Sequence, residues 1–144
     1  MIHKVKLRIE KCISRSNEDC YKAFTDEKQL SAWFTTNAKC DLRVGGYYSN
    51  DDKDEGIYLE LVPFERIKFT WDNKEHCPGT EVEVELIPSG NGNTEIILTH
   101  MRLESEKHIE EMKTGWRWAL SSLKSYLETG KPVSYNDWKN SEQN

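Results

Sequence analysis

The sequence predicts an α+β fold in which six or seven antiparallel strands curve around one long C-terminal helix. Two patterns lead to this prediction. Between residues 46 and 103, segments with an apolar residue at every second position alternate with turn residues, which indicates strands joined as hairpins. Residues 105–129 carry apolar residues at steps of three and four, which indicates one long amphipathic helix. Such a helix must bury its apolar stripe against a sheet.

Length and composition are those of one ordinary globular domain. The chain has 144 residues, of which 36% are hydrophobic and 31% charged. The net charge of -5 argues against a nucleic-acid partner, because phosphate binding requires a basic face. No apolar run approaches the roughly 20 residues that cross a bilayer, and the N-terminus lacks the apolar stretch of a signal peptide. We therefore expect a cytoplasmic protein without a membrane partner, whose cysteines are reduced thiols.

The first strand and two short helices come next to each other in the chain. Residues 5–11 alternate apolar and charged side chains, which predicts a strand with one buried face. Ser16 or Asn17 is a suitable cap for a following helix, and acidic residues occupy its first turn, where the helix dipole favours them. We expect one or two short helices here, with a break near Thr25–Asp26.

The middle of the chain supplies the remaining strands. Gly45–Gly46 separates two apolar runs and suits a tight turn or bulge, since glycine tolerates positive φ. Residues 57–71 contain two strands, and Pro63 should lie at a strand end because it cannot donate a ladder hydrogen bond. Residues 80–87 alternate valine or leucine with glutamate, and residues 94–103 form the last strand.

The terminal helix has clear start and stop signals. Ser105 is a possible cap, and Gly130 is the expected end. We therefore assign residues 1–130 to one domain and residues 131–144 to a loosely ordered tail. Two aromatic residues of the tail are expected to tether it to the domain, Tyr135 and Trp138.

Five stretches, in this order and over nearly the whole chain, resemble a known family. They are CYKAFTDEKQLSAWF, DLRVGGYY, GIYLELVPFERIKFTW, TEVEVELIPSGNGNTEIILTH and GWRWALSSLKSYLE. Together they are similar to the bacterial branch of the activator of heat-shock-chaperone ATPase homologues. That family belongs to the START-like, or SRPBCC, superfamily, whose helix-grip fold leaves a cavity between the sheet and the C-terminal helix.

The resemblance implies the fold more directly than the function, since this fold hosts many functions. The eukaryotic chaperone activators carry an additional N-terminal domain that contributes to chaperone activation. Here the chain begins directly with the first expected strand, so the resemblance implies chaperone activation only weakly.

The family-like registration turns a set of mostly aromatic residues toward the expected cavity. An apolar lining with sparse polar groups is typical of small-molecule sites. The candidate cavity residues are Trp33, Tyr48, Asn50, Phe69, Trp71, His100, Met112 and Trp116.

Two residues of the terminal helix raise a specific question. Gly115 costs about 1 kcal/mol of helix stability relative to alanine, so it must either admit close packing or leave room for a ligand. Trp116 lies on the apolar stripe and is either core filler or a cavity wall. Trp118 lies roughly 200° further round and should be at the edge or outside, covered by the tail or by a second subunit.

The sequence leaves two interpretations for each of three polar residues. His100 shares a face with Ile96 and Leu98, and is either a core or rim histidine or a group that orients a ligand or transfers a proton. Tyr58 and Glu60 share one expected strand face, which is either the cavity or the solvent side. We favour an ordinary solvated charge for Glu60.

No catalytic motif is present in the sequence. There is no nucleophile elbow, zinc-protease motif or glycine-rich phosphate loop. His76 and Cys77 are an adjacent pair of potential metal ligands, but no second pair follows nearby, so we expect no metal and no cofactor.

Three functions therefore remain. The first is non-catalytic binding of a small hydrophobic or aromatic molecule, which the expected cavity favours. The second is protein binding related to chaperone ATPase activators, for which the sequence shows no compact docking face. The third is a cyclase or hydrolase, for which only His100 qualifies as an ionisable cavity group. A homodimer is a possible assembly.

Overall fold

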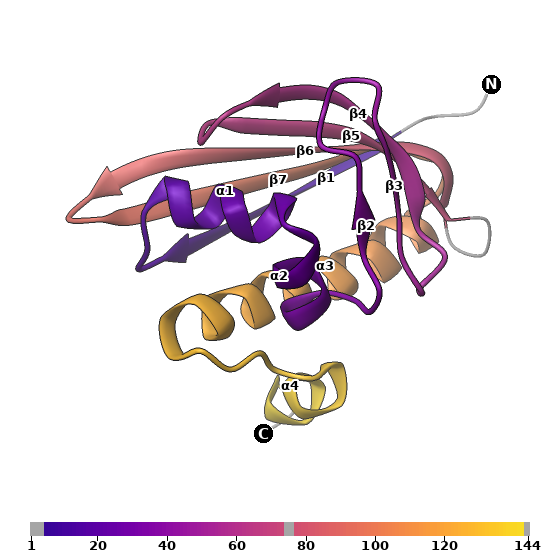
Figure 1. The fold of residues 1–144 in the computed structure, drawn as a ribbon. Helices are drawn as coiled ribbons and strands as arrows, with labels where there is room; N and C mark the ends of the chain where they lie inside the picture. Colours follow the sequence, from indigo (N-terminus) through magenta and orange to yellow (C-terminus); the bar gives the residue numbers. More distant parts are fainter. Residues whose placement is uncertain (1–4, 74–76, 143–144) are drawn as a thin grey trace.

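The computed structural model describes residues 5–73 and 77–142 and shows a seven-stranded antiparallel sheet with a long helix across it (Figure 1). The strands are β1 Val5–Ile13, β2 Lys39–Cys40, β3 Tyr47–Ser49, β4 Glu55–Val62, β5 Arg66–Asn73, β6 Cys77–Gly90 and β7 Asn93–Leu103. The helices are α1 Asn17–Thr25, α2 Glu27–Trp33, α3 Glu106–Thr129 and α4 Tyr135–Glu142. The strand order is β1-β7-β6-β5-β4-β3-β2, which confirms the predicted helix-grip α+β fold.

The helix boundaries follow the predicted caps. Ser16 caps α1 by accepting a hydrogen bond from the backbone N–H of Asp19. Asp26 ends α1 and begins α2, where its carboxylate accepts from the N–H of Gln29. Ser105 caps α3, and Gly130 closes it in the left-handed conformation at φ 85°. The break near Thr25–Asp26 is therefore a capped junction between two helices.

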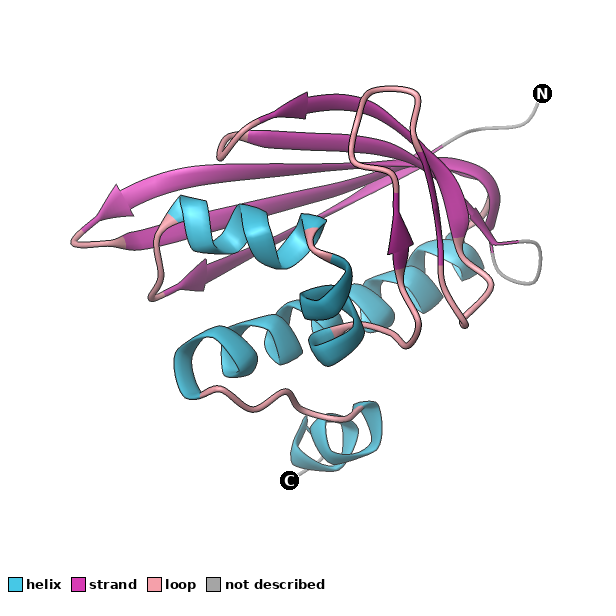
Figure 2. Ribbon diagram, viewed as in Figure 1, coloured by secondary structure: helices cyan, strands magenta, loops and turns pink. Residues whose placement is uncertain are grey.

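The two longest strands, β6 and β7, pair with each other in the interior of the sheet. β6 pairs with β7 from Glu81 opposite Met101 to Gly90 opposite Asn93. The predicted alternation holds, because Val82, Val84 and Leu86 are buried while the glutamates between them lie on the outer face. All the helices lie on the other, concave side of the sheet (Figure 2). No helix in the described part of the chain is long and apolar enough to cross a membrane.

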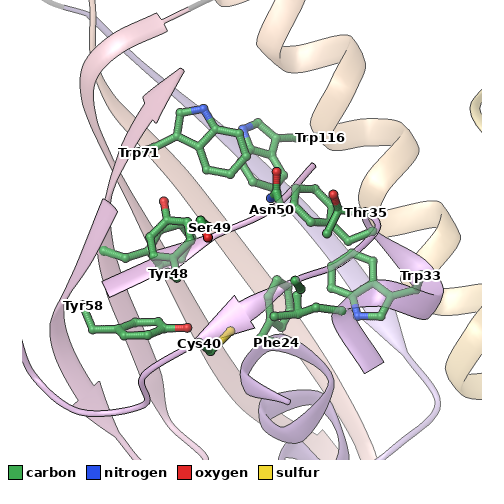
Figure 3. A pocket seen from close by; sticks show the side chains of 14 residues that line it. Phe24, Trp33, Thr35, Cys40, Tyr48, Ser49, Asn50, Tyr58, Trp71 and Trp116 are labelled. Carbon is green, nitrogen blue, oxygen red and sulfur yellow. The ribbon is translucent and has the colours of Figure 1, made fainter. Parts of the chain in front are cut away.

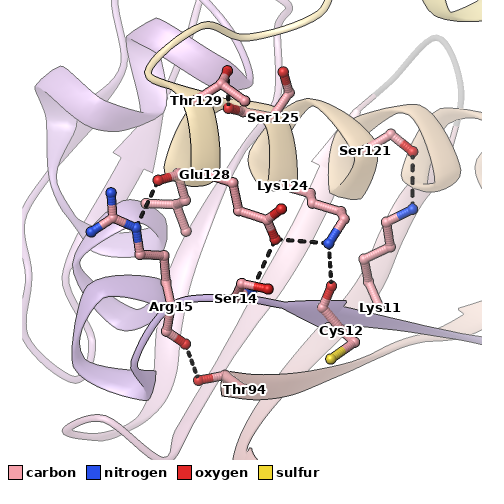
Figure 4. Close-up of polar contacts among 11 residues, drawn as sticks. Lys11, Cys12, Ser14, Arg15, Thr94, Ser121, Lys124, Ser125, Glu128 and Thr129 are labelled. Carbon is pink, nitrogen blue, oxygen red and sulfur yellow. Dashed lines mark hydrogen bonds and ion pairs between the residues drawn. The ribbon is translucent and has the colours of Figure 1, made fainter. Parts of the chain in front are cut away.

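Helix α3 also covers part of a sheet edge, since β1 has a neighbouring strand on one side only. Lys124 donates to the carbonyl oxygen of Cys12 at 3.1 Å, and the N–H of Ser14 donates to Glu128 at 2.8 Å. Lys124 and Glu128 also form an ion pair with each other at 2.7 Å (Figure 4). These side chains satisfy backbone groups at the end of β1 that a free edge would leave open to other chains.

The tail is more ordered than the sequence predicted. It contains α4, and Trp138 of this helix is buried. Trp118 donates from its indole nitrogen to the carbonyl oxygen of Val133 at 2.8 Å and packs edge-on against Tyr135. The prediction of a loosely ordered tail was wrong, because a polar helix of about two turns becomes stable once Trp138 and Tyr135 anchor it. The predicted tethering residues are the ones that make these contacts.

Candidate functional site

A small hollow lies between α2, strands β3 to β5, and α3. Its volume is about 50 Å³. It is lined by Phe24, Leu30, Trp33, Phe34, Thr35, Ala38, Cys40, Tyr48, Ser49, Asn50, Tyr58, Phe69, Trp71 and Trp116. Eight of these fourteen residues are aromatic. We call this space the inner pocket; Figure 3 shows Trp71 and Trp116 together at one end and Tyr58 with Cys40 at the other.

The structure brings together six of the eight residues expected in the cavity. They are Trp33, Tyr48, Asn50, Phe69, Trp71 and Trp116. Met112 lies on α3, half-buried against the core, and does not line the inner pocket. His100 also lies outside the lining and is fully buried.

His100 is bonded on both sides of its ring. The indole N–H of Trp116 donates to His100 Nδ1 at 3.0 Å, so Nδ1 must be an acceptor and the proton of the neutral ring is on Nε2. Nε2 then donates to the hydroxyl of Thr80 at 2.7 Å, which in turn donates to the carbonyl oxygen of Trp71 at 2.8 Å. Burial lowers the pKa of His100 to about 4, which keeps the ring in this neutral form. This chain of bonds links the side chain of Trp116 to the backbone of Trp71 at one end of the pocket.

The lining of the inner pocket carries no charge. Burial raises the pKa of the Tyr58 hydroxyl far above its ordinary value, and the hydrogen bond with Cys40 raises it further. Burial also raises the pKa of the Cys40 thiol. Both groups are therefore neutral at physiological pH, and a charged ligand group would find no counter-charge among the lining residues.

One buried side-chain nitrogen of the lining has no hydrogen-bond partner in the described part of the chain. Trp33 donates its indole N–H to the carbonyl oxygen of Ala23, and Tyr48 donates its hydroxyl to the carbonyl oxygen of Thr70. The indole N–H of Trp71 is buried and has no hydrogen-bond partner among the described residues. A buried donor left unpaired costs roughly 1–3 kcal/mol, so an acceptor that reached this N–H would be stabilised by it.

Tyr58 and Glu60 lie on opposite faces of the sheet, although strand periodicity predicts one shared face for them. The register between β4 and β5 shifts between these two residues. Such a bulge inserts one extra residue and reverses which side chains face inward. Tyr58 is therefore in the inner pocket, while Glu60 forms an outer ion pair with Arg66 at 2.8 Å. This exposed ion pair agrees with the solvent-facing charge that we favoured for Glu60.

Neither close packing nor room for a ligand explains the glycine in the middle of α3. A Cβ at Gly115 would meet no heavy atom within 4 Å, and Gly115 is not part of the pocket lining. The packing interpretation of Gly115 is therefore wrong. Trp118 lies at the edge of the helix beneath the tail, as the helical phase predicted.

Phe34 is the site residue that sequence reasoning missed most clearly. It follows the last residue of α2, and its ring contacts four tryptophans. The ring is parallel to that of Trp116, with centroids 5.8 Å apart and planes differing by 3°. The only signal in the sequence was an aromatic pair, Trp33-Phe34, at a helix end, where the direction of the second side chain is not fixed by helical periodicity.

A second, larger hollow lies outside the first. It has a volume of about 950 Å³ and runs between the end of α2, α3 and the tail. Its lining residues are Ala32, Trp33, Phe34, Thr35, Thr36, Asp52, Trp118, Ser122, Pro132, Val133, Ser134, Tyr135 and Asp137. We call it the outer groove. It shares three consecutive residues with the inner pocket, namely Trp33, Phe34 and Thr35.

No metal centre is formed by the described residues, in which no three His, Cys, Asp or Glu side chains could hold an ion together. The candidate pair His76-Cys77 falls outside this description, since His76 is not among the described residues and the side chain of Cys77 is not described either.

The curved sheet, the long helix across it and the two short helices after β1 define a START-like protein. Residues 14–128 match the family model described as Activator of Hsp90 ATPase homolog 1-like protein, and the chain belongs to this family. No curated protein matches the chain.

Several solved structures share the fold. CalU16 from Micromonospora echinospora is 27% identical in sequence, with a TM-score of 0.77 over 87% of this chain and 77% of that one. The Aha1 dimer from Colwellia psychrerythraea is 26% identical, with a TM-score of 0.79 over 88% of this chain and 98% of that one. An HSP90 activator from Plasmodium falciparum is 26% identical, with a TM-score of 0.66 over 77% and 86% of the two chains.

Proposed function

We propose that the protein binds a small, neutral, mostly apolar molecule with an aromatic ring in the inner pocket. The observation that carries this proposal is the lining itself, in which eight of fourteen residues are aromatic and the ionisable groups are held neutral. Aromatic rings offer large flat surfaces at fixed positions, so a flat ligand gains stacking contacts without ordering many side chains.

The polar contact of this ligand is the indole N–H of Trp71. His100, the polar group expected from the sequence, has both nitrogens engaged with Trp116 and Thr80. This engagement also supports binding rather than acid-base catalysis, because a proton-transferring histidine needs a nitrogen within reach of the substrate. The ligand should therefore carry one hydrogen-bond acceptor, such as a carbonyl oxygen.

The test is a titration with prodan, a neutral naphthyl ketone, followed by quenching of tryptophan fluorescence. The wild-type protein should bind it saturably. Trp71→Phe keeps an aromatic ring but removes the N–H, so it should weaken binding by roughly fivefold, the value of one lost hydrogen bond of about 1 kcal/mol.

Trp138→Phe is the control, because Trp138 is equally buried but lies in α4, away from the inner pocket. It should leave prodan affinity unchanged. Failure of the wild-type protein to bind prodan up to millimolar concentration, or equal losses in the two variants, would rule out the proposed site.

Protein binding is the second candidate function. Five large apolar residues are exposed at one end of the sheet, Leu42, Val44, Tyr47, Ile57 and Leu59. Tyr47 and Ile57 are paired across β3 and β4, so these two exposed side chains are neighbours. Exposed apolar patches of this kind are typical of protein contacts. The similarity to the Plasmodium falciparum HSP90 activator supports a chaperone as the partner.

A binding assay with a purified HSP90-type chaperone distinguishes this function from ligand capture. Ile57→Glu should abolish binding, whereas Lys22→Glu on the exposed side of α1 should not. The Colwellia psychrerythraea neighbour is a dimer, which supports a homodimer as a further proposal, testable by light scattering. We also keep the cytoplasm as the proposed location, which the free thiols of Cys12, Cys20 and Cys40 support.

A further inference from the structure

The inner pocket is too small in this form for the ligands proposed above. Its volume is about 50 Å³, whereas sites for drug-sized molecules enclose roughly 300–1,000 Å³. A few water molecules fit, but a naphthalene ring does not. A ligand can therefore enter only if part of the wall moves, and the wall residues differ in how firmly their contacts hold them.

The wall between the inner pocket and the outer groove consists of Trp33, Phe34 and Thr35. Trp33 is fixed, because its indole N–H is bonded to Ala23 and its carbonyl oxygen accepts from Ser122 at 2.7 Å. Thr35 donates its hydroxyl to Asp52 at 2.7 Å. Phe34 is half-buried, and only ring contacts hold its side chain.

We propose that Phe34 is a displaceable plug, and that a flat ligand ring takes its place against Trp116 when the inner pocket and the outer groove join. This inference rests on the proposed ligand-binding function. The parallel stack of Phe34 on Trp116 shows the orientation that the ligand ring adopts. The ring centroids of Trp71 and Trp116 lie 5.1 Å apart, so the Trp71 ring, whose N–H is unpaired, borders the same position.

The joined space also restricts the charge of the ligand. The inner pocket offers no cation, and the outer groove adds the carboxylates of Asp52 and Asp137. An anionic ligand would pass two like charges and then leave its own charge in a pocket without a partner. The ligand class is therefore a neutral flat aromatic compound with a carbonyl acceptor, and excludes free fatty acids and aromatic carboxylates.

The central experiment measures prodan affinity and association rate in Phe34→Ala. Only the wild-type molecules in which Phe34 is displaced can bind the ligand, so the apparent affinity is reduced in proportion to their fraction. Removing the Phe34 ring should therefore tighten prodan binding by roughly tenfold and speed association. Phe34→Trp should act in the opposite direction, because a larger ring fills the same place. Naphthoate, an anion of similar ring size, should bind at least about tenfold more weakly than prodan to every variant.

Phe69→Ala is the matched control, since Phe69 is also half-buried and lines the inner pocket but not the outer groove. It enlarges the pocket without opening the wall and should not speed association. Phe34→Leu provides a second variant in case Phe34→Ala unfolds, and should give a smaller gain of the same sign.

The results of these experiments distinguish the plug proposal from the ligand-binding proposal on which it rests. If prodan binds the wild-type protein in a Trp71-dependent manner but Phe34→Ala and Phe34→Leu show unchanged or weaker affinity, the plug is overturned and the binding function stands. If Phe69→Ala speeds association as much as Phe34→Ala does, simple enlargement explains the gain and the plug is again overturned. If no variant binds prodan, both proposals fall.

Discussion

His100 has both ring nitrogens bonded inside the core, and its titration is therefore tied to folding. Its pKa is lowered by burial to about 4, whereas the ordinary value is 6.5. Between these values the unfolded chain binds more protons than the folded one. The free energy of unfolding should consequently fall as the pH drops from 6.5 to 4, by up to roughly 3 kcal/mol, and this contribution should level off below pH 4.

Urea denaturation at several pH values checks this expectation. His100→Gln cannot take up the proton, so it should be less stable near neutrality but should show a shallower decline across the same window. Carboxylates titrate in both proteins, so the difference between their two slopes of unfolding free energy against pH isolates the contribution of His100. Parallel slopes would show that His100 does not titrate with folding.

Trp116 and Trp118 of α3 differ in burial and should therefore differ in their contribution to stability. Trp116 is 5% exposed, stacks in parallel on Phe34 and contacts the rings of Trp71 and His100 at steep angles. Trp116→Ala should lower the free energy of unfolding by roughly 3–5 kcal/mol, the usual loss for a buried large aromatic residue. Trp118 is half-buried beneath the tail, so Trp118→Ala should cost clearly less. Chemical denaturation of both variants decides the matter, and equal losses would contradict the assigned helical phase.

At the scale of single elements, the glycines of α3 give a matched pair of substitutions. A Cβ at Gly115 meets open space within an ordinary helix, so Gly115→Ala should stabilise the protein by about 0.5–1 kcal/mol. Gly130 has φ 85°, a left-handed conformation that disfavours other residues, so Gly130→Ala should destabilise by a similar amount. Thermal melting of both variants tests the pair; a loss in Gly115→Ala would reveal a role that the packing does not show.

The elements themselves were largely predictable because their signals are local. Capping residues such as Ser105 and alternation such as that of residues 80–87 act within a few residues of the chain. The β4 bulge between Tyr58 and Glu60 was not predictable, because the register shift depends on pairing with β5. A period of two carried across the bulge places one of the two residues on the wrong face.

At the scale of the whole molecule, the site is harder to predict than the fold because it depends on contacts between distant segments. Six of the eight residues that the family-like registration turned inward line the inner pocket, and all but Asn50 lie in a strand or helix. Phe34, Cys40 and Tyr58 reach the same space from a helix end, an edge strand and a bulge. At such positions the side-chain direction is set by the assembled fold rather than by the local pattern.

The tail offers a test of how the molecule divides into parts of different stability. Helix α4 is held by the buried Trp138, by the ring contact of Tyr135 with Trp118, and by an ion pair from Arg117 to Glu142 at 3.3 Å between largely exposed side chains. An exposed ion pair contributes little, so Trp138 should supply most of the docking energy. Trp138→Ala should therefore release α4 while leaving the sheet folded, because an undocked helix of eight residues is not stable alone.

Hydrogen exchange followed by mass spectrometry can resolve this local event. In Trp138→Ala the amides of residues 135–142 should exchange at nearly the unfolded rate, while those of β6 and β7 keep their protection. Arg117→Ala, which removes only the ion pair, should leave α4 protected. The same release should expose Trp118, since the tail supplies the Val133 acceptor of its indole N–H. Loss of protection across β6 and β7 as well would mean that the tail and the sheet unfold as one unit.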